Sequence, residues 1–264
     1  CGLFCRFASS FSMAYGLPGT SLNTARLVRV LANLAVADVI ESKQSLAERL
    51  GQWLDFTDAM ALFSALNGNA PVAQNKAPVS PGGTVQGDFA RVRTALADSI
   101  TMDGVLNPGR ARIKLPTPAA NAPVESAADF SPYHRYYQAH QRDMNAAIGP
   151  LRANVRAALA GGSPALQRLA ALDAVMEQAL ATRERNLLAS LPLLLAKRFG
   201  HLYKAHQEAL GDRLAQDDPE MWMRPGGWLA MYCRDMQAVL LAELEVRLQP
   251  VAGLIEALGN EVRT

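Results

Sequence analysis

Aromatic residues are scarce in this chain, at 6% of its 264 residues. Apolar residues as a class are abundant, at 50%, so the core has to be filled mainly by leucine, alanine and valine. Leucine and alanine are strong helix formers. The composition therefore favours a helical protein, and the length is sufficient to bury a sizeable hydrophobic core.

The chain also lacks a charge imbalance, a cysteine pattern and a long apolar run. Its 26 basic and 24 acidic residues give a net charge of +2, which indicates neither nucleic acid nor an anionic membrane as a partner. Three cysteines leave at least one unpaired, and their spacing fits neither a zinc knuckle nor a redox CxxC. The longest nearly uninterrupted apolar run, from Leu187 to Ala196, is about half the length that crosses a bilayer. We expect no transmembrane segment and a reducing, cytoplasmic compartment.

Signatures of catalysis and of ligand binding are missing as well. The sequence contains no Gly-rich phosphate loop, no GxSxG elbow, no HExxH and no Cys/His zinc pattern. His134 and His140 are six residues apart and His201 and His206 are five apart, whereas two ligands on one helix face need a spacing of four. His140 and His206, the latter near Glu208, are expected to be structural residues bonded to a carboxylate. The sequence predicts no catalytic residue, no metal and no cofactor.

What the chain does have is helical periodicity, most clearly after Ser131. Ser131-Pro132 is expected to open a first long helix with the serine as N-cap, and Gly161-Gly162 ends it. The short connection to a second helix at Ser163-Pro164 forces the two to lie antiparallel. A third follows Gly226-Gly227. Because each helix has one apolar seam that has to be hidden, the sequence predicts an all-α fold, with an antiparallel bundle of three long helices and shorter N-terminal helices packed on it. The seams are Tyr133, Tyr137, His140, Met144, Ile148, Leu151, Val155 and Leu159; then Leu166, Leu169, Leu172, Met176, Leu180, Leu187, Leu191, Leu194, Phe199, Leu202 and Leu210; then Leu229, Tyr232, Met236, Leu240, Leu244, Leu248, Val251, Ile255 and Leu258.

Stretches rich in proline, glycine and polar residues interrupt this periodicity twice before the bundle. The predicted order is a disordered or non-native extension at 1–21, a helical pair at 22–66, a flexible linker at 67–87, a short helix at 88–103, a Pro-rich loop at 104–130 and the long three-helix bundle at 131–264.

Within the helical pair, the first helix is predicted from about Thr24 to Val39. The second is predicted to run without a break to Asn67, with Met60 and Phe63 among its core-facing residues. Asp88 is expected to cap the short helix that follows the linker.

The first two residues, Cys1 and Gly2, fit two interpretations. A lipidated Cys1 would anchor the protein to a membrane surface. We prefer the interpretation that Cys1 to Ser12 does not belong to the native protein, which would begin near Met13. This stretch has no helical period, and a mature lipoprotein needs no second cysteine there.

Each long helix carries an interior proline, namely Pro150, Pro192 and Pro250. Proline removes one backbone donor and crowds the carbonyl four residues earlier, so a bend is expected near each. A bend that lets a long helix wrap its neighbours explains these residues better than a hinge does.

Two features of the seams are expected to be structural. Arg183, Glu184 and Arg185 interrupt the second seam, and we predict a polar layer that fixes the helix register by pairing with Glu243 or Asp143. Cys233 falls on the bundle-facing side of the third helix and is predicted to be an inert core thiol.

The turn before the third long helix is the most plausible partner site in the sequence. Trp, Met and Arg are enriched in protein interfaces, and here they lie between helices rather than in a seam. A lid over the open end of the bundle is the competing interpretation. The predicted partner-binding residues are Trp222, Met223, Arg224 and Trp228.

The start of the first long helix offers an alternative surface. Interleaved aromatic and basic side chains can stack on bases and neutralise phosphates, although scattered arginines are more often a solvated helix face. The residues of this nucleic-acid alternative are Arg135, Tyr136, Arg142, Arg152 and Arg156.

Three stretches of the chain resemble an uncharacterised bacterial family, domain of unknown function 3348. They are Leu46 to Asp55, then Ser163-Pro164-Ala165-Leu166 through Arg183-Glu184-Arg185, and Arg234 to Pro250. The resemblance extends over most of the chain from about Leu22. The family has no assigned activity, so the resemblance implies nothing about catalysis. It does imply a cytoplasmic protein encoded near envelope proteins of the peptidoglycan-binding and ion-motor type, which suggests an adaptor.

We therefore expect a noncatalytic helical scaffold or adaptor that binds another protein and is linked to a cell-envelope assembly. A nucleic-acid-binding helical protein is the alternative, although nucleic acid is not the expected partner. The sequence does not specify whether the chain forms a homo-oligomer.

Overall fold

A computed structural model of the chain describes residues 20–34, 51–67, 84–107, 109–119, 124–211 and 217–261. The predicted extension at 1–21 lies almost entirely outside these residues, as do most of the predicted linker and the part of the helical pair between 35 and 50. Within the described residues every regular element is a helix and there is no strand. The predicted all-α fold class is therefore confirmed.

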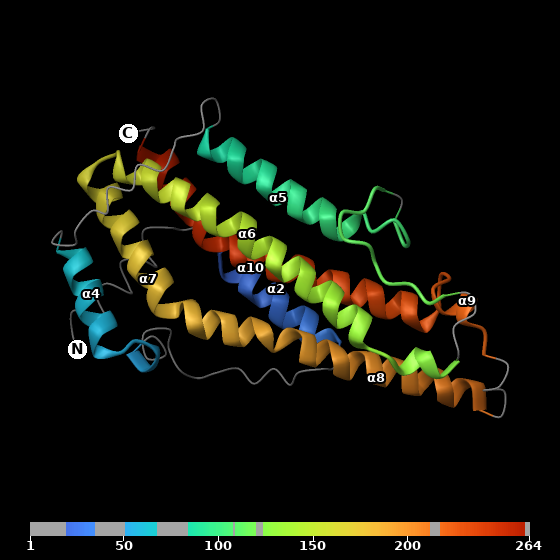
Figure 1. The fold of residues 1–264 in the computed structure, drawn as a ribbon. Helices are drawn as coiled ribbons and strands as arrows, with labels where there is room; N and C mark the ends of the chain where they lie inside the picture. Colours follow the sequence, from blue (N-terminus) through green and yellow to red (C-terminus); the bar gives the residue numbers. More distant parts are fainter. Residues whose placement is uncertain are drawn as a thin grey trace.

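The three long seams lie side by side in one elongated bundle. Helix α6 (Ser131–Ala160) and helix α10 (Trp228–Glu261) run in the same direction (Figure 1). Helices α7 (Pro164–Ala189) and α8 (Leu191–Leu210) connect them and run in the opposite direction. Every seam residue predicted for α6 is buried. The apolar face of α6 is thus covered within the bundle, whereas much of the α7 seam is only half-buried.

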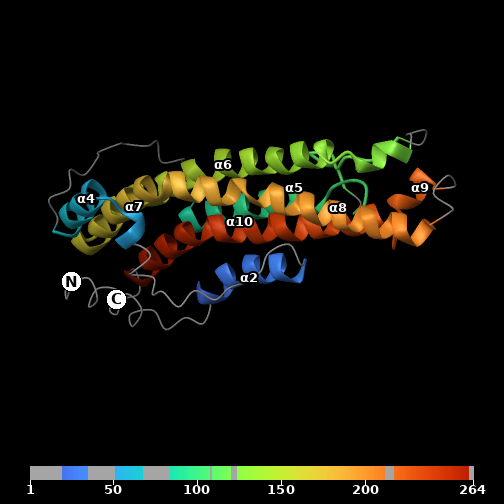
Figure 2. The same cartoon turned by 90° about the horizontal axis from the view of Figure 1, so that it is seen from below.

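Helix α10 is the central element of the bundle. The sequence predicted only one buried face for this helix, so its central position was not expected. It contacts α6, α7 and α8 and also the shorter helices α2 (Thr20–Asn33) and α5 (Val85–Thr101). Figure 2 shows α2 lying along α10 on the side away from α6. Residues outside the predicted seam, such as Ala230, Val239 and Ala242, are consequently buried as well. The N-terminal helices therefore complete the core along the bundle.

The helix predicted as one element from Pro164 to Leu210 is two helices, separated at Ser190. Pro192 lies in the first turn of α8, where a missing N–H is tolerated. It cannot donate to the carbonyl of Leu188, four residues earlier. That oxygen instead accepts a 3.1 Å hydrogen bond from the side-chain amide of Gln141 on α6. The break shifts the seam, so that Leu188 is buried and the predicted Leu187 is exposed.

The other two interior prolines do not end their helices. Pro150 and Pro250 lie within α6 and α10, and both are exposed on the outside of the bundle. An exposed position lets water satisfy the backbone carbonyl that each proline leaves without its usual donor.

Three predicted helix starts need correction. Helix α6 has no side-chain cap from Ser131; the Asp129 carboxylate accepts from the Ser131 backbone N–H at 2.9 Å. Helix α5 begins at Val85, capped by the hydroxyl of Thr84, whereas Asp88 had been predicted. The helix predicted to run unbroken to Asn67 is interrupted at residues 54–55.

Asp55 explains that interruption. It is the N-cap of α4 (Phe56–Leu66) and forms a reciprocal capping box with Asp58. A residue with an extended backbone and a short acceptor side chain starts a new helix in preference to continuing an old one. Helix α4 lies against α7 at one end of the bundle, where Leu62 and Ala65 are buried (Figures 1 and 2).

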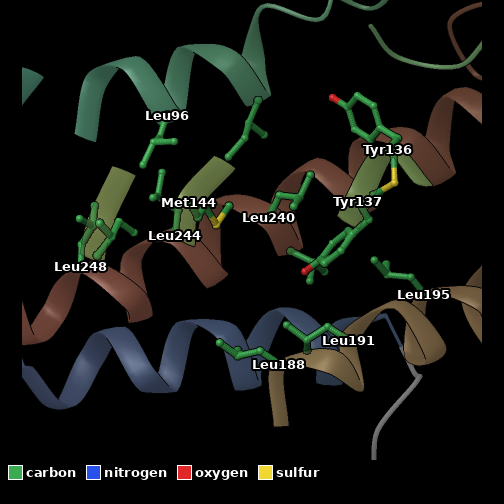
Figure 3. Packing of buried hydrophobic residues seen from close by; sticks show 14 of the residues in the cluster. Leu96, Tyr136, Tyr137, Met144, Leu188, Leu191, Leu195, Leu240, Leu244 and Leu248 are labelled. Carbon is green, nitrogen blue, oxygen red and sulfur yellow. The ribbon is translucent and has the colours of Figure 1, made fainter. Parts of the chain in front are cut away.

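The core is aliphatic along most of its length. Figure 3 shows Leu240, Leu244 and Leu248 of α10 among residues of α5, α6, α7 and α8. Aromatic rings gather instead toward the end where α8 meets α10, around Phe199 and Tyr232, whose centroids are 5.1 Å apart. Most of the buried aromatic rings among the described residues are thus found toward this end of the bundle.

Candidate protein-binding surface

The predicted partner turn is part of the interior. Trp222 of the short helix α9 (Pro219–Trp222) is 1% exposed, and Trp228 at the start of α10 is 6% exposed. Their ring centroids are 6.0 Å apart. Only Arg224 of the four predicted residues is exposed, while Met223 is half-buried. The two tryptophans therefore lie inside the fold, and their burial does not favour partner binding through them.

A carboxylate holds this turn closed. Asp217 accepts a 2.9 Å hydrogen bond from Trp222 Nε1, and both of its oxygens lie 3.0 Å from His206 Nε2. The His206 ring in turn stacks on Trp228. His206 is thus bonded to a carboxylate as predicted, but the partner is Asp217, since Glu208 pairs with Lys204. The competing interpretation, a lid over the end of the bundle, describes this arrangement.

The alternative nucleic-acid face is largely used within the fold. Arg152 forms a bidentate pair with Asp173 of α7, with contacts of 2.6 and 2.9 Å, and Arg156 contacts Asp173 and Glu177. Tyr136 is buried and cannot stack on a base. Arg135 and Arg142 are exposed on α6. The structure therefore does not bring the five residues together as one aromatic and basic surface.

The polar layer of the bundle is made by other residues than those predicted. Arg183, Glu184 and Arg185 are all exposed, and the Arg183 guanidinium lies over the ring of Trp53, 4.9 Å from its centroid. They interrupt the apolar seam because this part of α7 faces outward. These three residues therefore do not form the predicted polar layer.

The actual layer is centred on Glu243 of α10, which is fully buried. It accepts hydrogen bonds from Tyr137 at 2.6 Å, from Gln141 at 3.0 Å and from Arg247 at 2.8 Å. Burial and the adjacent carboxylate hold the pKa of the Tyr137 phenol well above its usual value. A fully bonded buried carboxylate of this kind fixes the relative position of helices, as proposed for the predicted layer.

Cys233 and His140 are both buried, and each has a shifted pKa. Burial raises the pKa of the Cys233 thiol to about 12, as expected for an inert core cysteine. Burial lowers the pKa of His140 to about 4, with the nearby Arg112 guanidinium contributing. His140 has no carboxylate partner among the described residues, contrary to the prediction. Nor do the described residues contain a group of three or more side chains able to hold a metal ion.

The most conspicuous surface feature is an apolar face on α4. Phe56 is 82% exposed, Met60 53% and Phe63 60%. Their spacing of four and three residues places them within about 60° of one another around the helix. The buried residues Leu62 and Ala65 lie on the opposite side, against α7. Helix α4 is therefore apolar on two faces, and among the described residues only the face with Leu62 and Ala65 is covered.

Helix α7, against which α4 packs, also carries exposed residues. Arg183, next to Trp53, has no ion-pair partner within the described part of the chain. Leu187, one helical turn further along α7, is 59% exposed. We call Phe56, Met60 and Phe63 the α4 patch.

Sequence reasoning missed this patch because it assigned Met60 and Phe63 to the core. The signal was present: an eleven-residue helix with apolar residues on both faces has more apolar surface than one neighbour can cover. Which face would be covered depended on where α4 docks, and periodicity does not specify this.

No helix in the described part of the chain is long and apolar enough to span a membrane. Comparison with curated proteins and with solved structures gives no match. The profile of the family described as "Protein of unknown function (DUF3348)" matches residues 13–260, which is nearly the whole chain. The protein therefore belongs to this family.

Proposed function

We propose that this protein is a noncatalytic helical adaptor, and that it binds an amphipathic helix of another protein through the α4 patch. The single observation that carries the proposal is the exposure of Phe56, Met60 and Phe63 along one helix face. Large apolar side chains that gather on a surface mark interaction sites more often than isolated exposed residues do. A stripe at this spacing matches the anchors of helix-in-groove and helix-on-helix recognition.

A positive charge next to Trp53, just before α4, suggests the chemistry of the partner. The Arg183 guanidinium stacks on Trp53, which precedes Phe56 by three residues in the chain. A partner helix with apolar residues at the same spacing and a carboxylate on its flank would cover the stripe and neutralise this charge. Complementary charge at an interface rim contributes specificity and association rate more than affinity.

The cellular setting is also a proposal. From the family resemblance of the sequence we expect the adaptor in the cytoplasm and its partner in a cell-envelope assembly. We expect no reaction to be catalysed.

Site-specific photo-crosslinking in native cells tests the binding surface. A photoreactive phenylalanine analogue at position 63 should crosslink to a helical segment of a different protein, and the same analogue in place of Met231 should not. Met231 is a suitable control because it is an exposed apolar residue on α10, outside the patch.

Charge reversal identifies the contact. Arg183→Glu should weaken the complex with the crosslinked protein, and a compensating acidic-to-basic change in its helix should restore binding. Crosslinks confined to residues of the same chain, or to a second copy of it, would show that the patch has another occupant and would overturn the proposal.

A further inference from the structure

Helix α2 is supported by a single neighbour. Helix α10 is the only described helix with which α2 makes more than a marginal contact, along the side of α10 that faces away from α6 (Figure 2). Helix α5, by comparison, packs on both α6 and α10. Helix α2 can therefore separate from the bundle by losing one contact surface, whereas α5 has to lose two.

The apolar part of the contact between α2 and α10 is small. Leu31 and Leu34 are buried, at 9% and 8% exposure, whereas Leu27 and Val30 are half-buried. Val28 is 40% exposed. Two buried leucines with two half-buried neighbours stabilise this contact far less than burial stabilises the core that the long helices share.

One ion pair adds to this contact. Arg26 of α2 pairs with Glu245 of α10, and the two side chains are 51% and 23% exposed. Ion pairs that water reaches contribute little to stability. The pair therefore orients α2 on α10, and it does not prevent α2 from separating.

Helix α2 also has little helical stability of its own. It is 14 residues long, and isolated helices shorter than about 12–15 residues are marginal in water. Its sequence includes two valines, two threonines and two asparagines, which are weak helix formers, and no acidic residue that could pair with its two arginines. Helix α4 likewise packs mainly on one helix, but its capping box stabilises it locally. Helix α2 therefore depends on its contact with α10 to remain helical.

We propose that α2 is a detachable strap on the bundle: it unfolds from α10 as a unit and binds again, while the long helices and α5 stay folded. In the closed state the strap covers the side of the central helix around Glu245. In the open state that side is bare, and the Glu245 carboxylate has lost Arg26. Local openings of this kind involve the least stable elements of a fold. Access to this side of α10 is thereby controlled by an element of the same chain.

Hydrogen exchange of the full chain, followed residue by residue by NMR, tests the strap. The backbone amides from Val28 to Leu34 should exchange at least about tenfold faster than the slowest amides of α6 and α10. Their exchange should hardly respond to urea below the unfolding transition, since opening one helix exposes little surface. Arg26→Gln should speed it by a further factor of about two to five. Lys204→Gln removes an exposed ion pair of α8 and is the matched control, which should leave the exchange of α2 unchanged.

A variant that weakens the bundle but not the strap separates local opening from global unfolding. Tyr137→Phe removes a buried hydrogen bond to Glu243, so it should speed the exchange of the slowest amides by about tenfold or more. Exchange in α2 should stay at its native rate. Equal acceleration in α2, or native protection of α2 as high as that of α6, would overturn the proposal. Exchange of α2 at the rate of an unfolded chain would also overturn it, since no closed state would then exist.

Discussion

The side-chain amide of Gln141 on α6 donates to the backbone carbonyl of Leu188, which is the acceptor that Pro192 leaves without a donor at the break between α7 and α8. The same amide also donates to Glu243 of α10. One side chain therefore connects all three long seams, and it does so at the point where the longest predicted helix is interrupted.

Replacing Gln141 by leucine should destabilise the protein by roughly 1–3 kcal/mol, because it leaves the Leu188 carbonyl and one Glu243 oxygen short of a donor. The cost should be smaller in a Pro192→Ala background, where a backbone N–H becomes available to Leu188. Urea denaturation of the two single variants and the double variant measures this coupling. Strictly additive costs would show that Gln141 does not compensate for the proline.

Removal of the Tyr137 hydroxyl should weaken the polar layer. Tyr137→Phe deletes the 2.6 Å hydrogen bond to fully buried Glu243 and should cost about 2 kcal/mol of unfolding free energy. Tyr133→Phe is the control, since the Tyr133 hydroxyl makes no hydrogen bond within the described residues. Equal stability of the two variants by thermal or urea unfolding would contradict a special role for Glu243.

His140 should make the protein sensitive to mild acid. Its pKa is lowered from 6.5 to about 4 by burial, with Arg112 contributing, so the unfolded chain binds a proton before the folded one does. Stability associated with neutral His140 is therefore complete above pH 6.5 and is lost as the pH falls toward 4. The loss is on the order of 3 kcal/mol.

His140→Leu should flatten the dependence of unfolding free energy on pH between 6.5 and 4, whatever its effect at pH 7. Urea denaturation at several pH values measures the slope. His201→Leu, at an exposed position of α8, serves as the control and should leave the slope unchanged.

The ion pair between α6 and α7 should contribute measurably to stability because it is largely shielded from solvent. Asp173→Asn removes the charge that Arg152 and Arg156 share and should cost roughly 2 kcal/mol. Glu208→Gln removes an exposed pair with Lys204 and should change stability by less than about 0.5 kcal/mol. A cost for Asp173→Asn no larger than that of Glu208→Gln, by chemical denaturation, would show that the pair is energetically neutral.

Trp222 should contribute mainly to the stability of the fold and not to a binding surface. Trp222→Ala removes a buried ring and the hydrogen bond to Asp217, and we expect a loss of roughly 3–5 kcal/mol. Met221→Ala, at the exposed preceding residue, is the control. Unfolding followed by circular dichroism measures both. If Trp222→Ala is as stable as the wild type, Trp222 does not support the fold and this turn becomes a candidate binding surface again.

Local rules of helix formation account for what the sequence alone determined. Seam residues such as Met144, Leu240 and Leu244 were predicted because a period of three to four residues is a property of the helix itself. The Gly-Gly-Ser-Pro connection likewise specified an antiparallel return without reference to the rest of the chain.

Tertiary structure alone decided the other features, because each depends on contacts between residues far apart in the chain. A proline in a helical pattern can bend the helix or end it, and Gln141 of another helix provides the donor that stabilises an end. An interface-like tryptophan can face solvent or the core, and Asp217 with His206 holds Trp222 inside. Helix α4 has two apolar faces, and its docking on α7 covered one and left Phe56, Met60 and Phe63 exposed.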